Sequence, residues 1–329
     1  GAVECWCDNV QLIYDEEKDV FSNQEGVSVR VPDWGQTTAF ESLSPSLLLE
    51  GATHYFSKFN DALEDAGYSR GSSIRGAPYD FRYAPPSMES FETELKALVE
   101  ETYAANDNTP VTMVSHSMGC YHALYFLQQQ SQEWKDTYVH AWVPISPAIG
   151  GTVNEMKLFA TGSSEGIPGV SSNTVRGEQR SYESNAWLLP DAATYGDDVL
   201  VSTTDRNYTA SDLDAFFTDI HFAVGTKIRA RVADLTGSLA TASPGVPVYC
   251  YYGTGVDTEA FYEYSGSFDD EPVVTMGDGD GTVNLKSLEL CKGFSEEVKA
   301  FPGETHSGLL DSSELQALVV SVATIAASN

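Results

Sequence analysis

The sequence predicts an α/β protein built on a parallel sheet. Strand-like and helix-like patterns alternate from about residue 54 to residue 150, and the strand pattern returns after residue 245. Because parallel strands need helical crossovers, this alternation favours a parallel sheet. The 329 residues could form two domains or one domain with an insertion, and 42% hydrophobic residues suffice for a sizeable core.

The expected elements are placed by the spacing of their apolar residues. A helix is predicted from Tyr55 to Ala66, where apolar residues recur at helical spacing and Gly67 suits a left-handed C-cap. Ser87 is the expected N-cap of a second helix, whose apolar stripe runs to Thr102. The further expected elements are a short strand at 73–77, a buried strand at 111–114, a helix at 118–130, strands at 139–146, 246–252 and 298–301, and a closing helix at 313–326.

Between residues 151 and 244 this alternation is lost. The stretch is rich in Gly, Ser, Thr and Asp, yet it carries many large aromatic residues, which a linker would not. We therefore interpret it as an inserted cap. The predicted organisation is an N-terminal segment at 1–26 (the remnant of a lid or membrane-binding region), a first core part at 27–151, a cap domain at 152–244 and a second core part at 245–329.

Charge and hydropathy exclude several classes of partner. The 18 Lys and Arg residues against 48 Asp and Glu residues leave a formal net charge of −30. Nucleic-acid binding needs a basic footprint, so no nucleic-acid partner is expected. Anionic membrane surfaces should repel the chain near neutral pH. No apolar run approaches the ~18 residues of a spanning helix, and no basic stretch with a following apolar run opens the sequence, so any signal peptide is expected to have been removed.

Cysteines and a glycosylation sequon bear on the compartment. The five cysteines are Cys5, Cys7, Cys120, Cys250 and Cys291. None forms a CxxC pair or has a His at metal-ligand spacing, so no metal site is expected. The sequon at Asn207 offers a glycosylation site. Acidity, the sequon and the odd cysteine count together favour an extracellular location or a lysosomal or vacuolar lumen.

The run Val-Thr-Met-Val-Ser-His-Ser-Met-Gly at 111–119 carries the sharpest chemical signal. A strand, a tight turn with Ser117 at its apex and a following helix are typical of the nucleophile elbow of α/β-hydrolases. The turn needs small residues two positions before and after the Ser, and Ser115 stands where the usual pattern has the first Gly. The alternative is an ordinary strand–helix turn that happens to hold a Ser. The strand–helix context favours the nucleophile elbow over this alternative.

A serine hydroxyl is a poor nucleophile, so Ser117 needs a His base and a carboxylate that orients the His. The hydrolase fold supplies them in the order Ser, acid, His, on loops after later strands. Asp280, in the Gly/Asp turn at 276–283, and His306, after the last predicted strand, fit that order. The turn could also be a plain or calcium-like turn, but it lacks the other carboxylates and terminal Glu of an EF-hand loop. His116 is expected to pack or hydrogen-bond structurally.

At these residues the chain resembles the family of lecithin:cholesterol acyltransferase and lysosomal phospholipase A2. The resemblance is collinear from residue 5 to about residue 310. The segments that carry it are Cys-Trp-Cys-Asp-Asn at 5–9, Val-Arg-Val-Pro at 29–32, Gly-Ala-Pro-Tyr-Asp-Phe-Arg at 76–82, His-Ser-Met-Gly at 116–119, Asn-Tyr-Thr at 207–209 and Gly-Asp-Gly-Asp-Gly-Thr-Val-Asn at 277–284.

The resemblance implies an α/β-hydrolase core with an inserted cap domain. It also implies an enzyme that acts on glycerophospholipids through an acyl-serine intermediate, with no cofactor. Ser117 would be the nucleophile, Asp280 the orienting acid and His306 the base. The Met118 amide would supply one oxyanion-hole donor. The family pattern also implies a disulfide between two cysteines and one glycosylated asparagine, which here are Cys250, Cys291 and Asn207.

The chain departs from the family pattern in four places. The family's first strand ends in a Pro-Gly loop that gives the second oxyanion donor, and its lid loop is closed by a disulfide to the cysteine matching Cys5; both would precede Gly1. Asp33-Trp34 stands for Gly-Phe, and Ser146-Pro-Ala-Ile for Gly-Ala-Pro-Trp. We therefore predict either a second, N-terminal chain of the same precursor, held non-covalently or through Cys5 or Cys7, or a local donor around Trp34, after the only local strand candidate at 27–32.

Two functional hypotheses follow. The first is a lipid acyl-ester enzyme, phospholipase A and/or phospholipid-dependent O-acyltransferase, whose partners are a lipid acyl donor and a lipid surface. The second is a non-catalytic, glycosylated structural or lipid-binding protein on a hydrolase scaffold. An intact triad favours the first hypothesis, and a missing N-terminal loop would favour the second.

Overall fold

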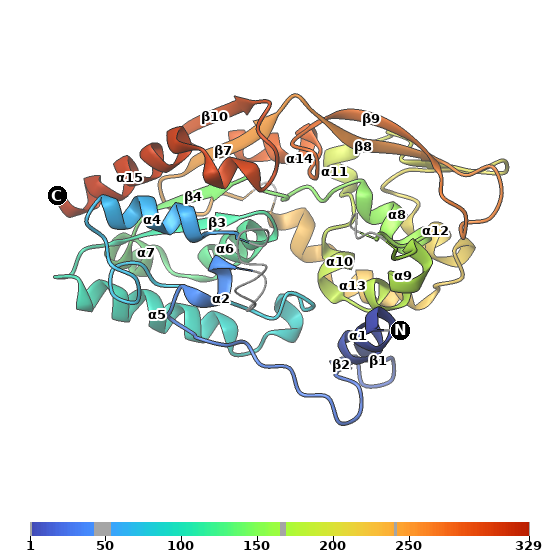
Figure 1. Ribbon diagram of the computed structural model, residues 1–329, viewed down its shortest axis with the longest axis horizontal. Helices are drawn as coiled ribbons and strands as arrows, with labels where there is room; N and C mark the ends of the chain where they lie inside the picture. Colours follow the sequence, from blue (N-terminus) through green and yellow to red (C-terminus); the bar gives the residue numbers. More distant parts are fainter. Residues whose placement is uncertain (1, 43–53, 165–168, 240–241, 329) are drawn as a thin grey trace.

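The computed structural model describes residues 2–42, 54–164, 169–239 and 242–328. A four-stranded parallel sheet organises the left part of the molecule in Figure 1. Its order is β10 (Glu297–Pro302), β7 (Tyr249–Thr254), β4 (Val139–Ile145) and β3 (Val111–His116). The predicted strands at 111–114, 139–146, 246–252 and 298–301 therefore lie side by side.

Helices cover both faces of this sheet. They are α4 (Ser57–Asp65), α5 (Phe91–Ala105), α6 (Met118–Gln129), α7 (Gln132–Tyr138) and α15 (Ser313–Ser328). Strand β4 shows how the faces are filled: Val143 and Ile145 pack in the cluster that holds Leu315 and Val319 of α15, whereas Trp142 packs in the cluster of α5 and α6. Alternate side chains of a strand point to opposite faces, so a strand covered on both sides is apolar throughout.

A second group of elements occupies the right part of Figure 1. Its helices are α8 (Asn154–Ala160), α9 (Ser172–Arg180), α10 (Glu183–Trp187), α11 (Ala192–Tyr195), α12 (Leu213–Asp219) and α13 (Val224–Leu239). A second sheet has the order β6 (Asn207–Tyr208), β5 (Val201–Ser202), β8 (Val256–Glu263) and β9 (Val273–Gly279). This sheet joins the ranges 152–244 and 245–329, because β5 pairs with β8.

The N-terminal segment packs against this second group. It forms α1 (Ala2–Val10) and a hairpin of β1 (Ile13–Asp15) and β2 (Val20–Ser22), below α9 in Figure 1. Arg82, 2% exposed, holds it in place by donating to the carbonyl of Val10 at 2.9 Å and to Asn23 Oδ1 at 2.8 Å. Asp80 pairs with the same guanidinium at 2.7 Å.

The shorter elements connect these layers. They are α2 (Thr38–Glu41), α14 (Leu285–Leu288) and three 3₁₀ turns, η1 (Pro85–Ser87), η2 (Glu289–Gly293) and η3 (Gly308–Asp311). Among the described residues, no helix has the length and apolar character needed to cross a membrane.

Four local predictions were wrong. Residues 73–77 form no strand; they meet the loop at residue 35 through one main-chain bond, Gly35 N–H to the Gly76 carbonyl at 2.9 Å. Ser87 ends η1, and Ser90 precedes α5, because the two prolines of η1 form their own turn first. Residues 27–32 adopt no regular element. Residues 276–279 belong to β9, so the turn at 276–283 begins only after Gly279; cross-strand pairing with β8 overrides the turn preference of Gly and Asp.

Candidate active site

Ser117 lies at the turn between β3 and α6 in a rare backbone conformation. Its φ of 55° and ψ of −127° are angles that non-glycine residues seldom adopt. Its main-chain N–H donates to the carbonyl of Ile145, at the end of β4, at 3.0 Å. A sharp turn of this kind presents the hydroxyl beyond the carboxyl end of the sheet. The structure therefore has the strand–turn–helix context that residues 111–119 predict.

Ser115 fits in place of the first glycine of the elbow. A Cβ built at Gly119 would lie 3.9 Å from the Ser115 Cβ, which is an ordinary contact. The Ser115 hydroxyl accepts a bond from Trp142 Nε1 at 2.8 Å and donates to Cys120 Sγ at 3.3 Å. The extra side chain is therefore held by hydrogen bonds, and the turn does not need to open for it.

His306 connects Ser117 to Asp280. Its Nε2 lies 2.8 Å from Ser117 Oγ, and its Nδ1 lies 2.7 Å from Asp280 Oδ2. The three residues sit on loops that follow β3, β9 and β10. The structure thus brings together the three side chains that the sequence analysis selected.

Asp280 is buried and fully hydrogen-bonded. Besides His306, its carboxylate accepts the main-chain N–H groups of Val283 at 2.8 Å and Thr282 at 3.1 Å. Burial alone would raise the pKa of Asp280, but His306 and the two amides outweigh burial and hold that pKa below its ordinary value of 3.8. An ionised Asp280 places the proton of neutral His306 on Nδ1, which leaves Nε2 as an acceptor facing Ser117.

Main-chain contacts fix the loops of Asp280 and His306 relative to each other. The His306 N–H donates to the Asp280 carbonyl at 2.7 Å. Gly281 turns the chain after Asp280 with a φ of +90°, which favours glycine. Gly253 of β7 allows a close approach, since a Cβ there would lie 2.1 Å from the Glu304 carbonyl oxygen. The backbone as well as the side chains therefore sets the position of the imidazole.

The two predicted oxyanion donors lie in different surroundings. Met118 is the first residue of α6, where a main-chain N–H has no partner within its helix. Trp34 packs edge-on against Phe91, with ring centroids 5.9 Å apart. No hydrogen bond or ring contact joins Trp34 to Ser117 in the described part of the chain. The oxyanion roles of Met118 and Trp34 stay predictions.

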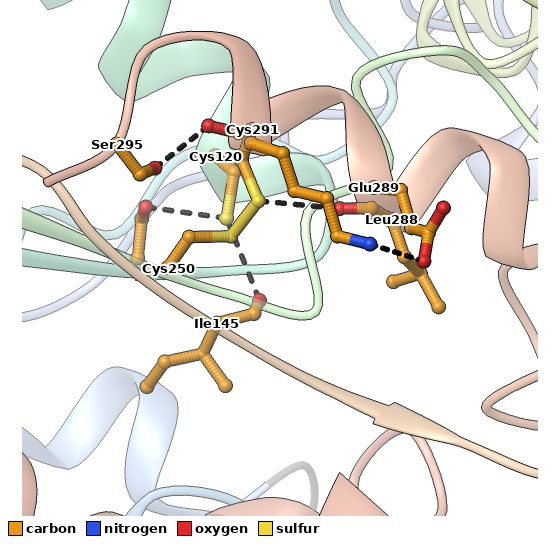
Figure 2. Close-up of a disulfide and its surroundings, with 9 residues drawn as sticks. Cys120, Ile145, Cys250, Leu288, Glu289, Cys291 and Ser295 are labelled. Atoms are coloured by element: carbon orange, nitrogen blue, oxygen red, sulfur yellow. Dashed lines mark hydrogen bonds and ion pairs between the residues drawn. A yellow bond between two sulfur atoms is a disulfide. The ribbon is translucent and has the colours of Figure 1, made fainter. Parts of the chain in front are cut away.

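A disulfide joins strand β7 to the 3₁₀ turn η2. Cys250 in β7 and Cys291 in η2 are joined, and both are fully buried (Figure 2). Cys120 is free and fully buried; its thiol bonds to the Ile145 carbonyl at 3.5 Å, and burial raises the pKa of that thiol to about 12. Of the two N-terminal cysteines, Cys5 is free and exposed and Cys7 is free and buried.

Comparison with known proteins identifies the family. The family model for lecithin:cholesterol acyltransferase matches residues 1–306. The chain belongs to the lecithin:cholesterol acyltransferase family. It is 40% identical over 315 residues to the lysosomal phospholipase A and acyltransferase of Bos taurus, covering 94% of this chain and 76% of the relative.

Other relatives agree with the assignment to the lecithin:cholesterol acyltransferase family. The chain is 42% identical over 318 residues to lecithin-cholesterol acyltransferase-like 1 of Arabidopsis thaliana, covering 93% of this chain and 73% of the relative. It is 38% identical over 292 residues to the phosphatidylcholine-sterol acyltransferase of Rattus norvegicus, with coverage of 88% and 65%. The chain is thus a lecithin:cholesterol acyltransferase-like enzyme.

A solved structure bears on the fold alone. The crystal structure of the Tle4–Tli4 complex matches with a TM-score of 0.54 and 13% identity, over 99% of this chain and 79% of that chain. The chain has a parallel sheet with helices on both faces, which agrees with the predicted α/β-hydrolase fold. The family assignment agrees with the same fold.

Two further site features concern the sequon and a residue that the sequence analysis missed. Asn207 is exposed on β6, so the predicted glycosylation site is accessible. Tyr55, predicted only as part of a helical stripe, lies before α4 and donates its hydroxyl to His116 Nδ1. No local pattern reveals this contact, because the two residues are 61 positions apart.

Proposed function

We propose that this chain cleaves or transfers the acyl esters of phospholipids through a Ser117–His306–Asp280 triad. The observation that carries the proposal is the pair of hydrogen bonds made by one imidazole, 2.8 Å to Ser117 Oγ and 2.7 Å to Asp280 Oδ2. Contacts at these distances suit proton transfer from the hydroxyl to Nε2 and stabilisation of the resulting imidazolium by the carboxylate.

The proposed reaction has two halves. Ser117 Oγ attacks the ester carbonyl carbon while His306 Nε2 takes the hydroxyl proton, and the Met118 amide donates to the developing oxyanion. The leaving lysolipid oxygen then takes that proton from His306, which leaves an acyl-serine. Water or a lipid alcohol, deprotonated by His306, attacks the acyl-serine and regenerates the hydroxyl. Hydrolysis and acyl transfer differ only in this second nucleophile.

A fluorophosphonate probe tests this proposal directly. The probe labels an activated serine, so we expect labelling of the wild-type chain at Ser117 and none of Ser117→Ala. Release of fatty acid from phosphatidylcholine vesicles, with and without an added alcohol acceptor, separates hydrolysis from transfer. Wild-type protein that is folded and remains unlabelled would favour the non-catalytic alternative.

We further propose that residues 152–244, together with β8 and β9, act as the cap over this site. Asn284, four residues after Asp280, supports the idea. Its Oδ1 accepts the Val153 N–H at 2.9 Å, and its Nδ2 donates to the Glu259 carbonyl at 2.9 Å. One buried side chain near the acid thus contacts both the start of the range 152–244 and strand β8.

The setting that we propose is a lysosomal or vacuolar lumen or the extracellular space, at a phospholipid surface. The lysosomal relative, the exposed Asn207 and the buried disulfide favour such a compartment. The exposed thiol of Cys5 is suitable for the predicted disulfide to a second chain, whereas Cys7 is buried. Intact mass before and after reduction tests that link, since a disulfide-bonded chain is released only by the reductant.

A further inference from the structure

His116 makes a second contact to the loop that carries His306, in addition to the contacts of Asp280. Its Nε2 lies 2.9 Å from the main-chain carbonyl oxygen of His306. A carbonyl can only accept, so Nε2 carries the proton and donates it. Nδ1 is then an acceptor, and it takes the hydroxyl proton of Tyr55. The His306 carbonyl therefore fixes the tautomer of His116, Tyr55 satisfies the remaining ring nitrogen, and His116 in turn holds the main chain of His306.

The packing around His116 leaves its ring little freedom. The ring is 6% exposed and lies 4.6 Å from the His306 ring, centroid to centroid. Tyr55 meets it edge-on at 5.3 Å and Phe56 at 6.3 Å. With this contact, His306 has all four of its polar groups bonded, namely both ring nitrogens, the N–H and the carbonyl.

We propose that His116 is a positioning residue for the base, which it holds through the main-chain carbonyl of His306, and that Tyr55 completes this arrangement. The inference rests on the proposed triad and deepens it. If the His306 carbonyl were released, the imidazole could swing away from Ser117 and Asp280. A displacement of 1 Å in a catalytic group can cost about 10²-fold in rate.

The charges around this cluster are compatible with a neutral His116. Burial, then the neighbouring His306, lower the pKa of His116 to about 3, while Asp280 acts in the opposite direction. The other ionisable neighbours of Tyr55 are Tyr79 and Cys120, and burial raises the pKa of both, so they are uncharged at neutral pH.

The same loop has a second, exposed anchor that serves as a matched control. Asp311, at the end of η3, pairs with Lys58 of α4 at 2.7 Å, and Lys58 is more than half exposed. An exposed pair of this kind contributes little. Lys58→Ala should therefore remove a contact to the His306 loop without moving the imidazole.

The test compares His116→Phe, His116→Gln, Tyr55→Phe and Lys58→Ala by kcat, KM and the acid limb of kcat/KM. For His116→Phe we expect kcat to fall about 10²-fold with KM within about twofold of wild type. The acid limb should move to lower pH, because an imidazolium less closely held by Asp280 is easier to deprotonate. His116→Gln keeps an N–H donor and should recover most of kcat, and Lys58→Ala should match wild type.

Three outcomes decide between the hypotheses. Wild-type kcat and an unmoved acid limb in His116→Phe would overturn the positioning role, provided that Ser117→Ala is inactive in the same assay. Activity in Ser117→Ala would instead overturn the triad itself. If thermal melting shows His116→Phe unfolded, Tyr55→Phe carries the test, since it removes a single hydroxyl; a wild-type kcat and acid limb there would equally overturn the proposal.

Discussion

The His306 imidazole reaches the Ser117 hydroxyl at 2.8 Å although 189 positions separate the two residues. Parallel strands explain the contact, because β3 and β10 lie in one sheet and end at the same edge. The loops after these strands therefore converge, and each can contribute one polar side chain to a common site.

Replacing the proposed nucleophile should abolish activity and leave the fold intact. Ser117→Ala removes the hydroxyl that attacks the ester, and we expect kcat to fall by about 10⁴–10⁶. The melting temperature should change little, because the hydroxyl packs in no core cluster. Ser211→Ala, an exposed serine, is the control and should keep full activity. Turnover of Ser117→Ala within tenfold of wild type would refute the assignment.

The acid limb of the pH profile of kcat/KM should reflect the loss of a single proton from the enzyme. His306 and two main-chain amides hold the pKa of Asp280 below its ordinary value, and burial lowers the pKa of His116 to about 3, so neither changes its protonation state in the neutral range; the proposed general base, His306, is the group that must be unprotonated. We expect log kcat/KM to rise with a slope of one from the acid side. A slope of two would mean that a second group titrates. Asp280 also affects the free energy of unfolding. The stability that its ionised carboxylate contributes is present above pH 3.8, and it is lost as the pH falls through the pKa of Asp280 in the folded protein.

Removing the disulfide should lower the free energy of unfolding and leave the catalytic rate unchanged. Cys250 and Cys291 are 41 positions apart, and closing a loop of that length stabilises by about 3–4 kcal/mol in the chain-entropy model. The double variant Cys250→Ala/Cys291→Ala should lose this amount in denaturant unfolding under non-reducing conditions. Cys120→Ala is the control for loss of a buried sulfur. Peptide mapping that finds both thiols free in the native protein would contradict the pairing.

Ser146, which stands where the family pattern has Gly, should lower the stability of the protein, and replacing it with Gly should restore that stability. Ser146 has a φ of 46°, which lies in the left-handed region. A non-glycine residue in this conformation lowers the free energy of unfolding by roughly 1–2 kcal/mol. Its hydroxyl is buried and has no hydrogen-bond partner among the described residues. Ser146→Gly should therefore stabilise the protein by about 0.5–1 kcal/mol after the entropic cost of glycine.

Asp33 is the control for Ser146, because its φ of 54° lies in the same left-handed region. Its carboxylate accepts the Thr38 hydroxyl at 2.7 Å, so Asp33→Gly gains backbone freedom and loses a hydrogen bond. We expect a change within about 0.5 kcal/mol. Chemical denaturation of both variants measures the difference, and destabilisation by Ser146→Gly would show that the conformation is not strained.

Binding to anionic vesicles should increase as the pH falls. The 48 acidic against 18 basic residues repel an anionic surface at neutral pH, and protonation near pH 4–5 reduces that repulsion. Because His306 must stay unprotonated, activity on such vesicles should pass through an optimum. Co-sedimentation with phosphatidylglycerol vesicles measures binding alone, with phosphatidylcholine vesicles as the control. Binding that rises monotonically to pH 8 would contradict this argument.

The four strands of the parallel sheet and the turn at Ser117 were predictable because their signals are local. Residues 111–119 carry the apolar strand, the small turn residues and the helix start within one short segment. The Gly/Asp run around Asp280 was harder to interpret. Gly277 and Asp278 favour a turn by themselves, yet in the structure they pair with β8, and only the residues after Gly279 turn.

What the sequence determined by itself was the parallel α/β core, the strand–turn–helix segment around Ser117, and Asp280 and His306 as the side chains that lie near Ser117 in the structure. These depend on backbone preferences and apolar spacing that neighbouring residues impose on one another. Only the tertiary structure decided that Tyr55 and the carbonyl of His306 meet at the His116 ring, and that β8 pairs with β5 of the range 152–244. Such contacts join residues far apart in the chain, so packing of the whole molecule selects them and no local pattern records them.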